Sequence, residues 1–247
     1  MRFFRTLPLI FLIVMQACSA GWHGAAITAS CPDVVKILPG YPSFKDGEGF
    51  FNDSLLYERG KALRNTERGR QAVVDARIGL DFYFERFGEA MGLKLSEQDS
   101  PAIAAFMQAT CKYASEGVMK AKDAFSRPRP FKHFGEPSGV PADEEKYGSS
   151  SSYPSGHTMM AWIVALSLAS IDEAHEYEII RVGYELGQSR VVSGFHYQSD
   201  VDAGRMAADA AYARVVSDPE YIRLMRRARK EVAALNRKGH LNFAVDK

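Results

Sequence analysis

The most restrictive feature of the sequence is a run of fourteen residues, HTMMAWIVALSLAS, that begins at His157 and is apolar all the way round a helix. A helix without a polar face has to be buried. The run is too short to span a bilayer, which takes about 20 apolar residues. We therefore predict a central helix that other helices enclose.

Helical patterns also occupy most of the remaining chain. Apolar residues recur at helical spacing from Asn52 onward. Ser100-Pro101 is a typical helix start and predicts a helix towards Asp123, and Asp218-Pro219 predicts one that continues to about Asn236. Two further helices are expected at 173–186 and 201–216. No stretch sustains the alternation of a strand, so the fold class predicted is all-α.

The organisation predicted is one helical domain over residues 51–240, preceded by an irregular arm over 21–50 that is rich in Gly, Pro and Ser. About 225 residues suffice for one sizeable core, so a single-domain bundle is expected. Pro, Gly and Ser also punctuate residues 127–154, which predicts a long loop.

Residues 1–20 have the features of a secretory signal peptide. Two arginines precede an apolar run over 7–15, and small residues follow at 17–20. The run is too short for a membrane anchor. We predict cleavage near Ala20, a periplasmic location and no membrane span afterwards. Lipidation at Cys18 and an ordinary buried helix are the alternatives.

The charge balance limits the possible partners. Loss of residues 1–20 removes two of the 31 basic residues and none of the 30 acidic ones, so the mature chain is close to neutral. A nucleic acid polymer is therefore not expected as a partner, and anion recognition has to be local. Cys31 and Cys111 could pair in an oxidising compartment, but two cysteines do not make a disulfide scaffold.

The first candidate patch is KAKDAFSRPRPF, from Lys120 to Phe131, which places cations beside two Arg-Pro pairs. Proline moves each preceding arginine into an extended conformation and stiffens its backbone. A stiffened arginine suits a guanidinium that has to be aimed at a phosphate or carboxylate. Taken alone, a basic helix end more often faces solvent and compensates the helix dipole.

The second patch is SSYPSGHTMM. Ser155 lies where the apolar helix should start, so Gly156 and His157 fall in its first turn. Free N–H groups at a helix start favour an anion, and glycine lets that anion approach closely. His157 would give a proton to a group that leaves the anion. The alternative is an ordinary serine cap with an incidental histidine. A similar triplet at 137–139 lacks the histidine and predicts plain loop.

The third patch is SRVVSGFHYQSDVDAGR, from Ser189 to Arg205. His196 and Asp200 are four residues apart and can meet on one helical face or across a helix start. A carboxylate bonded to one imidazole nitrogen fixes the tautomer and leaves the other nitrogen free as a nucleophile. Arg190 would act as a bidentate anion clamp. Alternatively, Asp200 only caps the following helix and His196 packs beside it.

Together the three patches supply what phosphoryl transfer requires: positive charge around the equatorial oxygens, an in-line nucleophile and an acid for the leaving oxygen. They resemble the signature of the type 2 phosphatidic acid phosphatase and vanadium haloperoxidase superfamily, as KDAFSRPRP, PSGH and SRVVSGFHYQSD. Within it, FNDSLLYERGKALRNTERG and SGFHYQSDVDAGR are similar to segments of bacterial class A non-specific acid phosphatases. The likeness covers most of the mature chain.

The resemblance implies an all-helical fold with the site at helix ends and loops, and a phosphomonoesterase that needs no metal or cofactor. Its expected substrates are phosphate monoesters over a broad range, including nucleotides and aryl phosphates. It further implies inhibition by vanadate or phosphate, a homo-oligomer and an acidic pH optimum. His196 would form a phosphohistidine, Asp200 would orient it, and His157 would protonate the leaving alcohol. The implied phosphate-binding residues are Lys122, Arg129, Ser155, Gly156 and Arg190.

One ambiguity lies in the first block, which fits Lys120 with Arg127 as well as Lys122 with Arg129. Residues two apart on a helix face nearly opposite ways, so both lysines cannot reach one phosphate. Relatives have Phe after the block, and Phe131 favours the second register.

Other functions stay open at this point. A vanadium-dependent haloperoxidase would use the same anion cradle, and a phosphoester-binding module would use the cations without the histidines. A membrane lipid phosphatase is disfavoured because no second apolar stretch reaches spanning length. A metal site built from His133, His157, His196 and Asp200 would lack a recognised zinc spacing. The preferred substrate is not named by the sequence; the loop 131–153 would select it.

Overall fold

A computed structural model describes residues 27–45 and 47–245 of the chain, so the predicted signal peptide lies outside the described residues. Within these residues the protein is all-α without a strand, which confirms the predicted fold class. The elements in chain order are η1 (Val34–Lys36), α2 (Gly47–Leu63), α3 (Glu67–Val74), α4 (Leu80–Ala90), α5 (Pro101–Ala124), α6 (Pro130–Phe134), α7 (Pro141–Tyr147), α8 (Gly156–Ala169), η2 (Glu173–His175), α9 (Glu176–Val192), α10 (Gln198–Val215) and α11 (Pro219–Val245).

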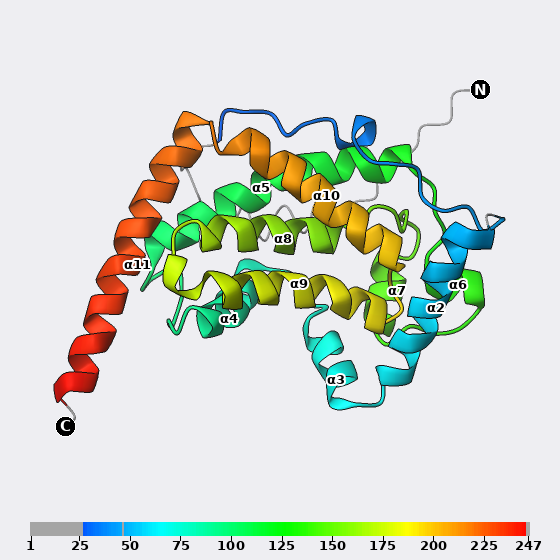
Figure 1. Cartoon of the computed structure of the whole chain (residues 1–247), viewed down its shortest axis with the longest axis horizontal. Coiled ribbons are helices and arrows are strands. Elements are labelled where there is room, and N and C mark those ends of the chain that lie inside the picture. The colour runs from blue at the N-terminus through cyan, green and yellow to red at the C-terminus, as the bar shows by residue number, and fades with distance from the viewer. Residues whose placement is uncertain (1–26, 46, 246–247) are drawn as a thin grey trace.

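Helix α8 is the predicted central helix. It packs against α5, α9 and α10, and Figure 1 shows it enclosed between them. Ile163, Val164 and Leu168 on α8 are fully buried. The contact with α9 is close because α9 carries Gly183 there: a Cβ on this glycine would lie 2.5 Å from the Ala165 Cβ. Gly183 thus allows α8 and α9 to pack closely at the centre of the core.

The last helix, α11, lies along one end of the bundle (Figure 1) and packs on α5 through an apolar stripe that includes Tyr221 and Leu224. Asp218 begins it by accepting hydrogen bonds from the backbone N–H groups of Glu220 and Tyr221 at 2.9 Å. The same carboxylate accepts bonds from Thr28 in the N-terminal arm. One buried side chain therefore caps α11 and holds the arm.

Several boundaries differ from the sequence prediction. The predicted loop over 127–154 contains two short helices, α6 and α7, each with proline in its first turn. They are too short to show a helical period in the sequence, and only their prolines signal them. Helix α2 begins at Gly47, inside the predicted arm, and α9 begins at Glu176. Cys31 and Cys111 are both buried, and no disulfide joins them.

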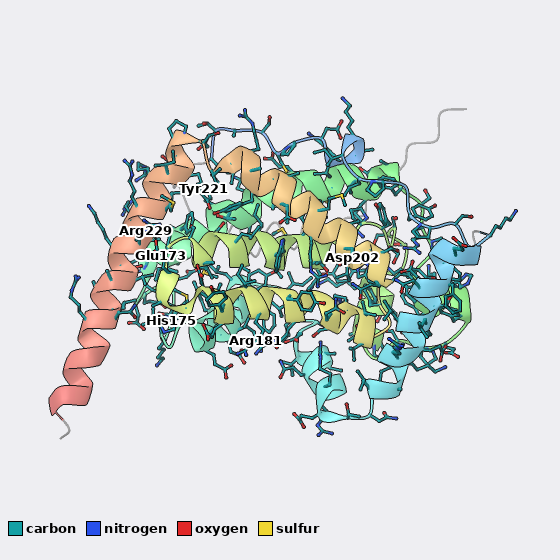
Figure 2. The ribbon with its side chains drawn as sticks, viewed as in Figure 1. Glu173, His175, Arg181, Asp202, Tyr221 and Arg229 are labelled. Carbon is teal, nitrogen blue, oxygen red and sulfur yellow. The ribbon has the colours of Figure 1, made fainter. Side chains whose placement is uncertain are left out.

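The topology gathers the three sequence patches at one end of the bundle. The end of α5, the start of α8, the end of α9 and the start of α10 lie together there, beside α2, α6 and α7 (Figure 1). In Figure 2, the labelled Asp202 on α10 lies towards this end, and Tyr221 and Arg229 on α11 mark the opposite one. Among the described helices, none has the length and apolarity needed to cross a membrane.

Candidate active site

A cavity of about 90 Å³ opens at this end of the bundle. One water needs about 10–15 Å³ on this measure, so the cavity holds a ligand of several heavy atoms. Six of the predicted site residues line it: Lys122, Arg129, Gly156, His157, Arg190 and His196. Residues more than 70 positions apart in the chain therefore meet around one space.

Of the two registers of the first block, the second one, Lys122 with Arg129, lines the cavity. Lys122 at the end of α5 donates from Nζ to the Ser151 carbonyl at 2.6 Å and to the Ser152 carbonyl at 3.2 Å. Arg129 has ψ 156°, the extended conformation that Pro130 imposes. Lys120 is exposed to solvent and does not line the cavity.

Contacts with neighbouring residues fix the orientation of the Arg129 guanidinium at the cavity. Its Nε donates to the Tyr147 carbonyl at 3.2 Å, and its Nη2 donates to Ser150 Oγ at 2.9 Å. Its guanidinium carbon also lies 4.2 Å from the centre of the Phe195 ring. A charged group held by so many contacts loses little entropy when it binds an anion.

Arg190, in the last turn of α9, offers the clearest unused binding capacity. One terminal nitrogen donates to Asp143 Oδ2 at 2.7 Å. Its Nε and Nη1 are buried and have no hydrogen-bond partner among the described residues. Buried donors normally have acceptors. Two unpaired guanidinium N–H groups beside a cavity are therefore suited to a tetrahedral oxyanion.

The second patch starts α8 as the sequence predicts. Ser155 is the N-cap, and its Oγ accepts hydrogen bonds from the N–H and the hydroxyl of Thr158. Ser155 is fully buried and does not line the cavity, so its contact with phosphate stays a prediction. Gly156 lines the cavity and also serves packing, because a Cβ there would lie 2.7 Å from Val118.

His157 faces the cavity with both ring nitrogens buried and without hydrogen-bond partners among the described residues. Burial and, second to it, the Arg190 charge lower the pKa of His157 to about 3, while the nearby Asp75 carbonyl opposes the shift. The ring is therefore neutral in the ligand-free protein near pH 5. An anion in the cavity would raise this pKa by offsetting the arginine.

The third patch brings His196 and Asp200 together across a helix start. Gly194 makes the turn after α9 with φ 70°, a conformation that favours glycine. Asp200, at the third position of α10, accepts from the Tyr197 backbone N–H at 2.9 Å and lies 3.3 Å from His196 Nδ1. The carboxylate thus caps the helix and also contacts the imidazole, so the two alternatives drawn from the sequence are compatible.

The contacts of His196 select one tautomer. Nδ1 faces the Asp200 carboxylate, and Nε2 lies 3.1 Å from Nη1 of Arg129, which can only donate. Both contacts are satisfied when the hydrogen is on Nδ1, which leaves the Nε2 lone pair on the cavity side. Burial lowers the pKa of His196 well below its usual value; Arg129 lowers it further and Asp200 opposes. The ring is thus held neutral and nucleophilic.

The cavity has an excess of positive charge. Burial lowers the pKa of Lys122 well below its usual range, and the neighbouring Arg129 adds to this. Burial would raise the pKa of Asp200, but the His196 hydrogen bond and the Arg127 charge outweigh it and keep this carboxylate ionised. Cations whose pKa is depressed by burial and by one another gain most when an anion enters. The arrangement therefore favours a phosphate-like ligand beside a neutral imidazole.

No cluster of three or more histidine, cysteine or acidic side chains placed to hold a metal occurs within residues 27–45 and 47–245. His133, a member of the metal alternative, lies outside the cavity and stacks on Phe44 with ring centroids 4.0 Å apart. It does not join His157 and His196.

Sequence reasoning missed several residues at this site. Asp143 pairs with Arg190, and Ser150 contacts Arg129. Ser152 donates to Asp200 Oδ2 at 2.5 Å and lies 3.4 Å from His196 Nδ1. All three lie in the stretch 127–154 that the sequence predicts as a long loop. The run of four serines before Tyr153 was the available signal, since a buried cationic site needs short acceptors close by.

Comparison with known proteins places these blocks inside a shared region. A family model described as PAP2 superfamily matches residues 102–221. A non-specific acid phosphatase of Providencia stuartii is 40% identical over 189 residues, 76% of this chain and 76% of that protein. One of Salmonella typhi is 34% identical over 201 residues, 81% of this chain and 79% of that protein. An acid phosphatase of Zymomonas mobilis is 31% identical over 189 residues, 76% and 72% of the two chains.

Proposed function

Because the chain belongs to the PAP2 superfamily and is an acid phosphatase, a phosphoric monoester hydrolase, we propose that it acts through a phosphohistidine on His196. The observation that supports this most directly is the cavity itself: the lone-pair side of His196, the unpaired donors of Arg190 and the His157 ring all border it. A binding module would have no use for an imidazole held in one tautomer.

The first step transfers the phosphoryl group to the enzyme. The phosphate oxygens take the N–H donors of Lys122, Arg129 and Arg190, which draws Arg129 Nη1 away from His196. The Nε2 lone pair of His196 then forms a bond to phosphorus while the bond to the ester oxygen breaks. His157, which takes a proton from the bound monoanionic ester, gives that proton to the departing oxygen, and the alcohol leaves neutral.

The second step returns the enzyme to its starting state. His157, now neutral, takes a proton from a water as that water attacks phosphorus. The P–N bond breaks, its electron pair returns to Nε2 of His196, and inorganic phosphate leaves as the monoanion, carrying the proton that His157 took from the water. Through both steps Asp200 retains its hydrogen bond to Nδ1, so the imidazole regains the same tautomer.

An acidic optimum follows from the low pKa of His157. The ring is neutral in the ligand-free protein near pH 5, so its proton arrives with the substrate: a phosphate monoester is a monoanion below its second pKa of about 6. As the pH rises through that value the substrate loses the proton and the rate falls. Protonation of His196 limits the rate at low pH, which gives a bell-shaped profile.

The apolar side chains of the cavity support a broad range of alcohols with a preference for flat apolar ones. Ile78, Val118 and Met160 line it together with the polar groups. Such a wall contacts an aryl ring or a nucleoside by dispersion and excludes water from it. The same wall of apolar side chains has no hydrogen-bonding groups to replace the water that a polyol loses on binding. We therefore place aryl phosphates and nucleotides above glycerol phosphates in kcat/KM.

The same proposal includes export and metal independence. Signal cleavage near Ala20 would deliver the mature chain to the periplasm, as a homo-oligomer inhibited by vanadate. N-terminal mass analysis of the exported protein tests the cleavage site. Activity retained in EDTA tests the absence of a required metal.

The main experiment measures kcat/KM for phenyl phosphate and glycerol 2-phosphate, with vanadate as inhibitor. Ile78→Ser should reduce the ratio of the two values by about 3- to 10-fold, since about 1 kcal/mol of apolar contact is lost. Ile37→Ser is the matched control: Ile37 is 44% exposed and Ile78 43%, but Ile37 is outside the cavity. Oxidation of bromide by peroxide with vanadate, without phosphatase activity, would instead identify a haloperoxidase.

A further inference from the structure

Arg127 belongs to the other register of the first block, Lys120 with Arg127, which does not line the cavity. It is 1% exposed and is the largest of the fully buried side chains among the described residues. Its Nη1 donates to Asp200 Oδ1 at 2.6 Å, and its Nη2 donates to Asp53 Oδ2 at 2.6 Å. A single guanidinium thus bridges the carboxylate that contacts His196 and a second buried carboxylate on α2.

Asp53 is itself fixed by the start of α10. It is 1% exposed, and its two oxygens accept from the backbone N–H of Ser199 at 2.9 Å and from the Ser199 hydroxyl at 2.5 Å. The guanidinium carbon of Arg127 lies 4.0 Å from the centre of the Tyr197 ring, which covers one face of the fork. Arg127 therefore has little freedom to move.

The bridge determines the orientation of the Asp200 carboxylate. Oδ1 accepts from Arg127, while Oδ2 accepts from Ser152 and from the Tyr197 N–H and faces His196 Nδ1. Rotation of the carboxylate would move Oδ2 away from the imidazole. Arg127 opposes that rotation because its bond to Oδ1 is short and is made by a charged group.

We infer that Arg127 and Asp53 are positioning residues for His196, acting through Asp200 to hold the imidazole in the tautomer and orientation that attack on phosphorus requires. This inference rests on the proposed function of His196. Neither residue lines the cavity, so neither is a catalytic residue. Because their charges are opposite, the pair fixes Asp200 while adding no net charge behind it.

The opposite charges of Arg127 and Asp53 predict opposite shifts of the His196 pKa when each is removed. A purely structural role would not produce these opposite shifts. The groups facing His196 are Asp200 and Ser152 at Nδ1, Arg129 at Nε2, Lys122 from α5, and Arg190 and His157 across the cavity. None of them is substituted in the variants of the bridge. Loss of the Arg127 charge should raise the pKa of His196, and loss of the Asp53 charge should lower it.

The experiment compares Arg127→Gln, Asp53→Asn and the double variant. The readouts are kcat, the inhibition constant of inorganic phosphate, the pH of the acid limb of kcat/KM, and the ¹⁵N NMR shifts of the His196 ring in the full chain. Arg127→Gln should lower kcat by about 100-fold, the cost of a misplacement of about 1 Å. Phosphate inhibition should stay within about 3-fold in every variant, because the cavity donors are untouched.

The acid limb should move to higher pH in Arg127→Gln and to lower pH in Asp53→Asn. In the double variant it should return to the wild-type position while kcat stays low. The NMR shifts should change from the tautomer protonated on Nδ1 to a mixture in Arg127→Gln. If Arg127→Gln does not fold, the double variant and Asp53→Asn carry the same test, since each leaves fewer buried carboxylates without a cation than Arg127→Gln does.

Asp218→Asn is the matched control. Asp218 is also a buried carboxylate that caps a helix, but it lies at the start of α11. The Asp218→Asn variant should be less stable than the wild type, with unchanged kcat, an unchanged acid limb of kcat/KM and unchanged NMR shifts of His196. Equal shifts in Asp218→Asn and Asp53→Asn, or an unchanged tautomer in every bridge variant, would overturn the inference. Altered NMR shifts in a protein without phosphatase activity would instead leave the positioning intact and remove only the proposed function.

Discussion

The two sides of the His196 ring differ in how their polar groups are satisfied. On the cavity side, the Nε and Nη1 of Arg190 and both ring nitrogens of His157 lack partners among the described residues. On the opposite side, Asp200 is surrounded by four donors, from Arg127, Ser152, Tyr197 and the imidazole itself. Buried polar groups are normally paired. The unpaired side is therefore where a ligand supplies acceptors, and the paired side is where geometry is fixed.

Arg127 and Arg129 are only two residues apart but lie on the two different sides of His196, the paired side and the cavity side. Each precedes a proline, yet Arg127 binds Asp200 on the Nδ1 side of His196 whereas Arg129 contacts Nε2 on the cavity side. Burial lowers the pKa of Arg129, and Arg190 lowers it further, so a bound anion stabilises it. Arg127 already has two carboxylates. Identical dipeptides thus take different roles because of what surrounds them.

The largest effect expected on the cavity side is the loss of the acid. His157→Ala should reduce kcat on an alkyl phosphate by about 1,000-fold, within the range for general acid catalysis. p-Nitrophenyl phosphate should lose far less, since its leaving group departs without a proton. Single-turnover rates on both substrates test this. Equal losses on the two would mean that His157 is not the acid.

The next effect separates the two registers of the first block. Lys122→Ala should lower kcat/KM by about 100-fold because it removes one preorganised charge from the cavity. Lys120→Ala should change it by less than about 2-fold, as expected for an exposed side chain on the other face of α5. Steady-state assays of the two variants decide between them. A crippled Lys120→Ala would reverse the assignment.

The pH dependence of stability tests the low pKa of His157. The unfolded histidine gains a proton below about pH 6.5, whereas the folded one stays neutral down to about pH 3. Stability of the ligand-free protein should therefore fall as the pH drops across this window, by about 1.4 kcal/mol per unit for each such histidine. Urea unfolding from pH 7 to 4 measures the slope. His157→Asn should reduce it, and inorganic phosphate should restore stability; identical slopes would contradict the account.

The smallest effect concerns the anion inside the cavity. Asp143→Asn should tighten inhibition by inorganic phosphate about 3- to 10-fold, because it removes a charge that repels the ligand and is worth on the order of 1 kcal/mol. Glu145→Gln makes the same change of charge on the solvent side of α7 and should have no effect. Weaker inhibition in Asp143→Asn would show that Asp143 mainly orients Arg190.

The sequence allowed the central helix and the cavity residues to be predicted because both are local patterns. The apolar run at 157–170 specifies burial by itself, and the cap at Ser155 places His157 in the first turn of α8. The spacing of His196 and Asp200 predicts their contact across a helix start. These features depend on residues within one or two turns of each other.

The features that escaped prediction depend on long-range contacts. Asp53 is 74 residues from Arg127 and 147 from Asp200, and nothing in α2 indicates that it faces either of them. Asp143 lies in a helix of seven residues whose only local signal is its first proline. A pair of buried charges has no sequence signature, because its stability depends on geometry that the whole fold creates.

The most direct test of the central claim is to trap the enzyme during turnover with an aryl phosphate, denature it in alkali, where phosphohistidine survives, and map the modified peptide by mass spectrometry. The account predicts a phosphoryl group on the His196 ring, absent from His196→Ala and formed more slowly in Arg127→Gln. A phosphoryl group on His157 instead, or turnover without any labelled histidine, would contradict it.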